Sequence, residues 1–305
     1  MSTTADVQPV GEGGLLRLAH GRLDLWLAPQ VGGCIAAFSY LSDEKGKIPI
    51  LRGAEIVPSS ILEAASFPLV PYSNRVRNGR FRFRGREVTL APNMEGDPSP
   101  LHGQGWLAAW TVEEHGSDRA TLVYRHAASD WPWAYEARQH FRLDEDGLSL
   151  RLSCHNLSGE PMPCGLGQHP YFPCTPETRL DAGIECAWTI DGQVLPVDKV
   201  PATGRYDLRD RLVCGQDLDN GFGGWSGSAR ITDPGLPFAI ELSSPAARFF
   251  QLYSPAAGGL FVAEPVTHAN AALNEPEEMW TELGLAIIGP GEEMALDSRL
   301  SVCPA

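Results

Sequence analysis

The chain has 305 residues, of which 43% are hydrophobic and 20% are charged, and its formal net charge at pH 7 is −14. A chain of this length and apolar content can bury a sizeable core, which excludes a disordered protein or a small disulfide scaffold. The acidic balance repels phosphate backbones and anionic lipid, so we expect neither a nucleic-acid nor a membrane partner. The 32 glycines and 25 prolines favour many turns and short elements over a helical bundle.

The cysteines and the first residues bear on the compartment. The seven cysteines are odd in number and form no Cys-x-x-Cys pair, which favours reduced thiols over a disulfide framework. Residues 1–14 lack the apolar stretch of an export signal, and no segment offers the ~20 apolar residues of a membrane helix. We therefore expect a cytoplasmic protein, with a flexible tail over residues 1–13 and a single domain over residues 14–305.

Apolar and polar residues alternate along several segments, which is the pattern of half-buried β-strands. Residues 23–27 show it early in the chain, and residues 80–84 show it as arginines alternating with phenylalanines. Further on, residues 135–143 and 148–152 flank an Asp-Gly pair at 146–147. An Asp-Gly pair between alternating segments is a strong local signal for a β-hairpin, so these two segments are predicted to pair.

The same pattern continues to the end of the chain. Asp191-Gly192 predicts a second hairpin, residues 296–302 alternate as a closing strand, and only residues 275–283 suggest a helix, which would be short. No repeat, low-complexity tract or linker divides the chain. The sequence therefore predicts one all-β domain, built from two large antiparallel sheets packed face to face and carrying few short helices.

Two polar segments contain candidate ligand contacts. Asn74 and Arg75 follow a proline-rich segment, and an amide beside a guanidinium offers the donors and the acceptor that neutral hydroxyl groups need. His102 is followed by Gly103, which allows the backbone to approach a ligand closely. The alternative is that all three residues belong to ordinary surface loops.

Two further residues are candidates for proton transfer. His169 precedes a proline and aromatic residues, and a histidine near its ordinary pKa of about 6.5 can exchange a proton close to neutral pH. Glu264 ends an apolar run, and burial would raise its pKa toward the range of a useful general base. The alternatives are a core histidine with satisfied hydrogen bonds and a glutamate that reaches solvent at the end of a strand.

Two other groups of residues are weaker signals for a functional site. The cysteines and histidines between residues 154 and 186 match no usual zinc spacing, and no phosphate-binding loop, dinucleotide fingerprint or serine-hydrolase elbow is present. Six arginines lie between residues 75 and 86. Their alternation with phenylalanines favours a solvated strand face, and the alternative is an anion site for a phosphorylated or acidic sugar.

Taken together and in order, five motifs resemble the aldose 1-epimerase (galactose mutarotase) family, in particular its shorter bacterial branch. The matching pieces are Pro71-Tyr72-Ser73-Asn74-Arg75, Leu101-His102-Gly103, His169-Pro170-Tyr171-Phe172, Leu218-Asp219-Asn220-Gly221-Phe222 and Glu264-Pro265. Each motif alone is unspecific, but five in one order span nearly the whole chain. The resemblance implies a large antiparallel β-supersandwich with a sugar cleft on one face.

The resemblance also implies roles for the matching residues. Glu264 stands where the family has its general base, and His169 where it has its general acid. The residues that hold the sugar in the family correspond to Asn74, Arg75, His102 and Asp219. Interconversion of α- and β-anomers needs a base for the C1 hydroxyl and an acid for the ring oxygen, and neither a metal nor a coenzyme. Trp106 or Phe222 is a candidate for stacking on the sugar.

The chain departs from galactose-specific members in two places, which leaves the preferred aldose open. Pro173-Cys174-Thr175 follows the His-x-Tyr-Phe motif, and Asn220 follows Asp219. Three other functions fit parts of the pattern: an epimerase of a phosphorylated or acidic sugar, a non-catalytic carbohydrate-binding or sensing domain, and a glycosidase or lyase that acts on a polysaccharide. The pairing of Glu264 with His169 favours catalysis, because binding alone does not require it.

Overall fold

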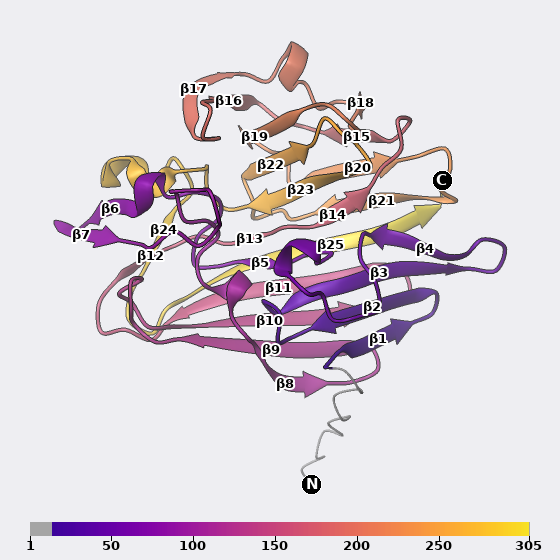
Figure 1. The fold of residues 1–305 in the computed structure, drawn as a ribbon, viewed down its shortest axis with the longest axis horizontal. Helices are drawn as coiled ribbons and strands as arrows, with labels where there is room; N and C mark the ends of the chain where they lie inside the picture. The colour runs from indigo at the N-terminus through magenta and orange to yellow at the C-terminus, as the bar shows by residue number, and fades with distance from the viewer. Residues whose placement is uncertain (1–13, 305) are drawn as a thin grey trace, which may run out of the picture.

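The computed structural model describes residues 14–304, so the expected tail over residues 1–13 lies outside the described part of the chain. Antiparallel β-strands make up most of it (Figure 1), which confirms the predicted all-β class. The helices of residues 14–304 are all three-residue 3-10 helices, and none is long enough to cross a membrane. They are η1 (Ile61–Glu63), η2 (Arg77–Gly79), η3 (Gly105–Leu107), η4 (Gly204–Tyr206), η5 (Ala272–Asn274) and η6 (Glu277–Met279).

The largest sheet has nine strands in the order β18-β15-β20-β21-β25-β11-β10-β9-β8. Its strands are β8 (Thr111–His115), β9 (Arg119–His126), β10 (Tyr135–Leu143), β11 (Gly147–Asn156), β15 (Arg179–Ala182), β18 (Arg211–Leu212), β20 (Ser228–Thr232), β21 (Phe238–Ser243) and β25 (Glu293–Pro304). The predicted closing strand is β25, which lies between β21 and β11 and joins the two halves of the sheet. The predicted hairpin β10–β11 is also confirmed, and Asp144 Oδ1 accepts the backbone N–H groups of Asp146 and Gly147 in its turn.

The second large sheet has eight strands in the order β17-β16-β19-β22-β23-β13-β5, with β14 also paired to β23. Its strands are β5 (Pro68–Leu69), β13 (Gly167–Gln168), β14 (Tyr171–Pro173), β16 (Cys186–Ile190), β17 (Pro196–Pro201), β19 (Leu218–Gly223), β22 (Phe249–Ser254) and β23 (Leu260–Val266). The predicted turn at Asp191 joins β16 to β17, and its carboxylate accepts the backbone N–H groups of Gln193 and Leu195.

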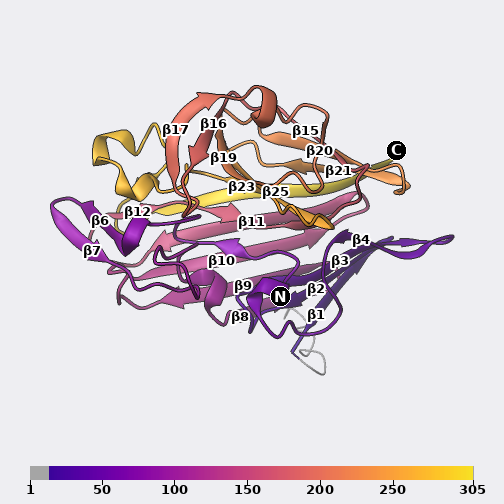
Figure 2. The ribbon, with the colours of Figure 1, turned by 45° about the horizontal axis from the view of Figure 1, so that its top comes forward.

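Three smaller sheets complete the fold. They are β1 (Leu16–His20), β2 (Leu23–Ala28), β3 (Cys34–Ser42) and β4 (Gly46–Leu51); β6 (Arg80–Phe83) and β7 (Arg86–Thr89); and β12 (Met162–Cys164) and β24 (Ala286–Ile288). The four-stranded sheet lies beside the nine-stranded one, where the backbone N–H of Ala19 donates to the carbonyl of Ser117 at 2.7 Å. Figure 2 shows that β6, β7 and β12 lie at the other end of the molecule, away from β1–β4.

One apolar cluster joins the two large sheets. It includes Leu122 of β9, Leu152 of β11, Phe222 of β19 and Phe250 of β22, and each of these side chains is fully buried. Burying one such side chain contributes about 1.5–3 kcal/mol. Because side chains alternate along a strand, the residues next to these in β19 and β22 point to the opposite face of the eight-stranded sheet, which is called the site face below.

The predicted helix over residues 275–283 is wrong in extent, since only the 3-10 helix η6 forms there. The backbone N–H groups of Trp280, Leu283 and Leu285 donate to carbonyls three, four and five positions back along the chain. This changing spacing gives a series of turns and no regular ladder, and Gly284 with φ +83° completes the reversal.

Candidate active site

The site face carries a buried carboxylate and a buried imidazole in contact. Glu264 of β23 is 3% exposed, and its Oε1 lies 3.4 Å from Nε2 of His169, which follows β13. Within the described residues, Glu264 Oε2 and His169 Nδ1 have no hydrogen-bond partner. Buried polar atoms are costly unless they are paired, so a pair of such atoms in one place indicates a ligand site. The two residues predicted for proton transfer are therefore brought together.

Aromatic packing holds the ring of His169. Its backbone N–H donates to the carbonyl of Phe67 at 3.1 Å, and the Phe67 ring stacks on it with centroids 4.4 Å apart. The ring of Tyr171 lies 4.7 Å away, and the guanidinium of Arg52 lies 3.4 Å from the Tyr171 ring centroid. Arg52 is itself fixed, because its Nε donates to the carbonyl of Ala64. The imidazole thus has a fixed orientation in an apolar surrounding.

Burial shifts the two pKa values in opposite directions. Loss of solvation lowers the pKa of His169 to about 3, and the charge of Arg52 adds to this effect. Loss of solvation, followed by the negative charge of Asp219, raises the pKa of Glu264 well above its ordinary value, while Arg75 opposes the change. Both shifts favour the neutral forms, so Glu264 holds a proton readily and His169 releases one readily. Together the two residues hold one proton over a wide pH range.

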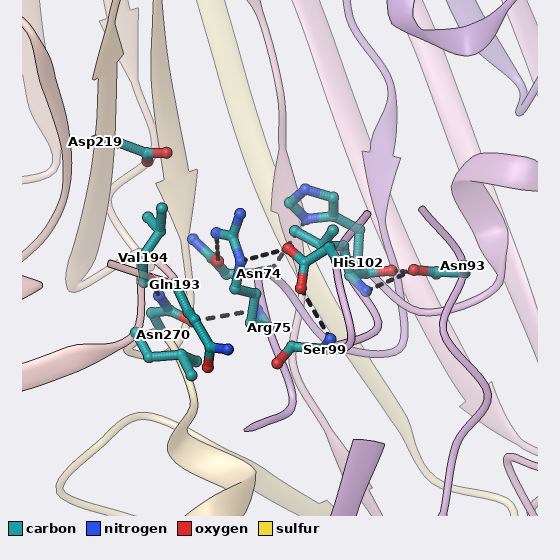
Figure 3. Close-up of polar contacts among 12 residues, drawn as sticks. Asn74, Arg75, Asn93, Ser99, His102, Gln193, Val194, Asp219 and Asn270 are labelled. Carbon is teal, nitrogen blue, oxygen red and sulfur yellow. Dashed lines mark hydrogen bonds and ion pairs between the residues drawn. The ribbon is translucent and has the colours of Figure 1, made fainter. Parts of the chain in front are cut away.

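Asn74 lines the same pocket as Glu264 and Gln251. Figure 3 shows the loop of Asn74 and Arg75 together with His102 and Asp219. Asn74 has a left-handed backbone with φ +57°, which asparagine tolerates better than most residues. Arg75 donates through Nε to Asp97 Oδ2 at 2.9 Å and through Nη1 to Asn74 Oδ1 at 3.3 Å, and its backbone N–H donates to Asn270 Oδ1. Acceptors on two sides therefore orient the guanidinium, whose charge also acts on the pKa of His102 and of Asp219.

His102 lies beside this loop with its tautomer defined by one hydrogen bond. Its Nδ1 accepts the backbone N–H of Asn74 at 3.0 Å, so the neutral ring carries its proton on Nε2. Burial lowers its pKa well below the ordinary value, and the neighbouring His169 and Arg75 add to this effect. The ring stands edge-on to that of His169, with centroids 5.4 Å apart. His102 can thus offer a neutral N–H donor next to the carboxylate–imidazole pair.

Asp219 reaches the site from β19 and is joined there by a residue that the sequence analysis missed. Its Oδ1 accepts Gln251 Nε2 at 2.9 Å, and Gln251 of β22 is the direct cross-strand neighbour of Glu264. Burial raises the pKa of Asp219, and Arg75 and Gln251 oppose that shift. Figure 3 shows Asp219 on a different strand from the Arg75 loop. A glutamine within an apolar strand, as in the run Phe-Phe-Gln-Leu-Tyr, was the available signal for Gln251.

The prediction that Trp106 or Phe222 stacks on a sugar is wrong. Trp106 is 1% exposed, and its Nε1 donates to the carbonyls of Leu101 and Gly103. Phe222 is fully buried on the core face of β19. Neither ring has a free face. The half-buried tryptophan on the site face is Trp188 of β16, which the sequence analysis did not single out.

The arginine run forms a solvated strand face beyond Arg75. Arg80, Arg82 and Arg84 are exposed, while the phenylalanines between them are buried. Arg77 is half-buried, and its Nη1 lies 3.8 Å from Asp191 Oδ2. In residues 14–304 no three His, Cys, Asp or Glu side chains are grouped to hold a metal ion, and all seven cysteines are free thiols.

Comparisons with known proteins show the family of this chain. The family model described as aldose 1-epimerase matches residues 15–300. The "Uncharacterized protein YphB" of Escherichia coli K12 is 36% identical over an alignment of 296 residues, which covers 93% of this chain and 97% of that protein.

Solved structures show the same fold. A "Putative aldose 1-epimerase" from Escherichia coli K12 superposes with a TM-score of 0.84 at 33% identity, over 95% of this chain and 99% of that one. A galactose mutarotase-like protein from Clostridium acetobutylicum shares the fold, with a TM-score of 0.83 at 18% identity over 95% of each chain. The family match covers nearly all of the described residues, and the chain belongs to the aldose 1-epimerase family.

Proposed function

We propose that the protein interconverts the α- and β-anomers of a free aldose, with Glu264 as the general base and His169 as the general acid. The observation that carries this proposal is the 3.4 Å contact between the two side chains, each of which has a second polar atom without a partner among residues 14–304. In a cyclic hemiacetal the hydroxyl oxygen O1 and the ring oxygen O5 are bonded to the same carbon. An acid and a base that lie close together, as these do, can therefore act on both oxygens of one sugar.

The reaction conserves protons within the pair. The resting pair is neutral, so the proton of Glu264 first passes across the 3.4 Å contact to His169. Glu264 as carboxylate then takes the proton from O1, His169 as imidazolium gives its proton to O5, the C1–O5 bond breaks and C1=O forms. Rotation about C1–C2 presents the other face of the aldehyde. O5 then attacks C1 while its proton returns to His169, and Glu264 gives its proton back to O1. Each proton transfer of this kind contributes typically about 10²–10⁴-fold to the rate.

The surrounding groups suit a neutral sugar. The amide of Asn74, the guanidinium of Arg75 and the Nε2–H of His102 offer donors, and the carboxylate of Asp219 offers acceptors for hydroxyl groups. The pairing of Arg75 with Asp97 offsets its charge, and Arg80, Arg82 and Arg84 point to solvent. These features disfavour a phosphorylated or acidic substrate. The free thiols support a cytoplasmic location for this activity.

Polarimetry of freshly dissolved α-glucose and α-galactose tests the proposal. The protein should accelerate the approach to anomeric equilibrium, and Glu264→Gln should lower kcat by about 10²–10⁴-fold, because the amide cannot take the proton. The exposed Glu87→Gln serves as a matched control and should keep the full rate.

Three outcomes would contradict the proposal. A Glu264→Gln variant as fast as the unaltered protein would rule out the mechanism. Calorimetric sugar binding without any acceleration would favour a binding or sensing domain. Release of new reducing ends from a glycan panel would favour a glycosidase or lyase.

A further inference from the structure

The site face continues from Glu264 across three more strands in one register row. Gln251 of β22 pairs with Glu264, and Gly221 of β19 pairs with Gln251. On the next strand, β16, Ala187 pairs with Phe222, which places Trp188 opposite Gly221. Directly paired residues project to the same side of a sheet, and neighbouring strands lie roughly 4.8 Å apart. Trp188 is therefore on the same face as the catalytic carboxylate and three strands away.

The glycines of β19 make room for the indole of Trp188. A Cβ atom on Gly223 would lie 3.0 Å from a ring carbon of Trp188, and one on Gly221 would lie 4.0 Å from another. Asn220 Nδ2 holds the strand from the other face by donating to the Trp188 carbonyl at 2.8 Å. The tryptophan thus rests on a floor of bare backbone, and it keeps part of its surface exposed.

A pocket of about 640 Å³ opens beside this tryptophan. Its lining includes Trp188, Lys199, Arg248, Phe249 and Glu282. This volume lies within the usual range of about 300–1,000 Å³ for small-molecule sites. The walls carry charges of both signs, and Lys199 Nζ lies 3.9 Å from Glu282 Oε1. Neighbouring positive and negative groups suit a neutral ligand with many hydroxyls better than an anion.

The arrangement of the catalytic groups gives the direction in which a bound sugar extends. His169 lies toward β13 and β14 from Glu264, whereas Gln251 and Asp219 lie on its other side, on β22 and β19. A sugar with C1 at the Glu264–His169 pair therefore has its remaining hydroxyls toward β19. The next strand beyond β19 is β16, which carries Trp188.

We propose that this pocket is a second sugar subsite, and that the preferred substrates are neutral reducing disaccharides or longer oligosaccharides. The reducing aldose occupies the Glu264–His169 site, and the following sugar unit packs its C–H face on Trp188. Aromatic side chains combine a large apolar surface with a polar edge, which matches the two kinds of surface on a pyranose. This inference rests on the proposed anomer interconversion and names the class of substrate for it.

Mutarotation of glucose, maltose, lactose and melibiose tests the inference, because each of these disaccharides has glucose as its reducing unit. The measured quantity is kcat/KM for a disaccharide divided by kcat/KM for glucose. For the disaccharide that the unaltered protein prefers, Trp188→Ala should lower this ratio by about tenfold. Trp26→Ala is the matched control: Trp26 is also half-buried and has a cation over its ring, Arg17 at 5.6 Å, compared with Lys199 at 5.7 Å for Trp188. Trp26 lies on β2, and we expect Trp26→Ala to leave the disaccharide-to-glucose ratio of kcat/KM unchanged.

A second variant covers the case in which Trp188→Ala does not fold. Thr281 is exposed on the rim of the pocket, so Thr281→Trp fills the pocket without altering the core, and it should lower the same ratio. If the protein accelerates glucose mutarotation but neither variant changes the disaccharide-to-glucose ratio, the second subsite is overturned and the proposed function stands. Absence of any acceleration, with glucose as well as with the disaccharides, would instead contradict the proposed function itself.

Discussion

Two buried histidines on the same side of the molecule differ in how their nitrogens are used. Burial lowers the pKa of His169 to about 3 and that of His268 to about 4. In His268, Nε2 accepts the backbone N–H of Ser73 at 3.0 Å, and Nδ1 donates to the carbonyl of Ala269 at 2.8 Å. In His169, one nitrogen faces Glu264 and the other has no partner within the described residues.

The comparison separates a structural histidine, His268, from His169, the histidine that we propose to be reactive. His268 connects the segment after β23 to the loop that carries Asn74, and its ring packs so closely on Gly165 that a Cβ there would lie 2.0 Å from a ring carbon. Depth of burial and direction of the pKa shift are shared by both residues. The unsatisfied polar atoms are what differ, and they mark the position where a ligand completes the hydrogen bonding.

The largest effect should come from His169. His169→Asn removes the proposed acid for O5 while keeping a polar side chain, and we expect kcat to fall by about 10²–10⁴-fold with a small change in KM. Steady-state polarimetry with a fresh α-aldose gives both constants. Retention of kcat within a few-fold would erase the distinction between the two histidines.

The structural histidine should affect stability first. His268→Ala leaves the backbone N–H of Ser73 without its acceptor, which costs about 1–3 kcal/mol of the free energy of unfolding. Urea denaturation measures this loss. We expect kcat to fall less than in His169→Asn when both variants are assayed well below their melting temperatures, and an equal or larger fall would show that His268 takes part in the chemistry.

The smallest effect should be a gain in stability on removal of the Glu264 carboxylate. Because the folded pKa of Glu264 is raised, the folded protein keeps a proton that the unfolded chain loses above the ordinary value of 4.5, so stability falls as pH rises above 4.5. Glu264→Gln removes this penalty and should stabilise the protein by about 1 kcal/mol at neutral pH.

Denaturation at several pH values checks the sign of this effect. The gain in Glu264→Gln should be absent below pH 4.5, should grow as pH rises, and should level off above the folded pKa of Glu264. His169 in the folded protein, with its pKa lowered to about 3, stays neutral over this pH range and does not produce the difference. A constant difference at all pH values would show that the carboxylate does not titrate as its burial implies.

Local signals in the sequence predicted the strands and hairpins well. The turn at Asp144 forms because its carboxylate caps nearby backbone N–H groups, an interaction encoded within four residues. The order of the strands could not be read in the same way. β25 lies between β21 and β11, and nothing local to residues 293–304 specifies either partner.

The candidate site was predictable only where motifs carried it. Glu264 and His169 were found from ordered motifs, and the structure places them in contact. Gln251 and Trp188 were missed because their relevance comes from the register of neighbouring strands. Phe222 was misplaced because Asn220, on the same side of β19, is also buried, so polarity along this strand does not show which face meets the core.

The link between Arg52 and Tyr171 has a consequence for how the protein can vary. Arg52 directly follows β4, its backbone N–H donates to the carbonyl of Tyr171 at 2.9 Å, and its guanidinium lies on the ring that touches His169. The four-stranded sheet is thus linked through Arg52 and Tyr171 to His169, the proposed general acid. A chimera that exchanged this sheet as a module would need to carry the arginine with it, and the turn at residues 43–45 is a better place to accept an insertion.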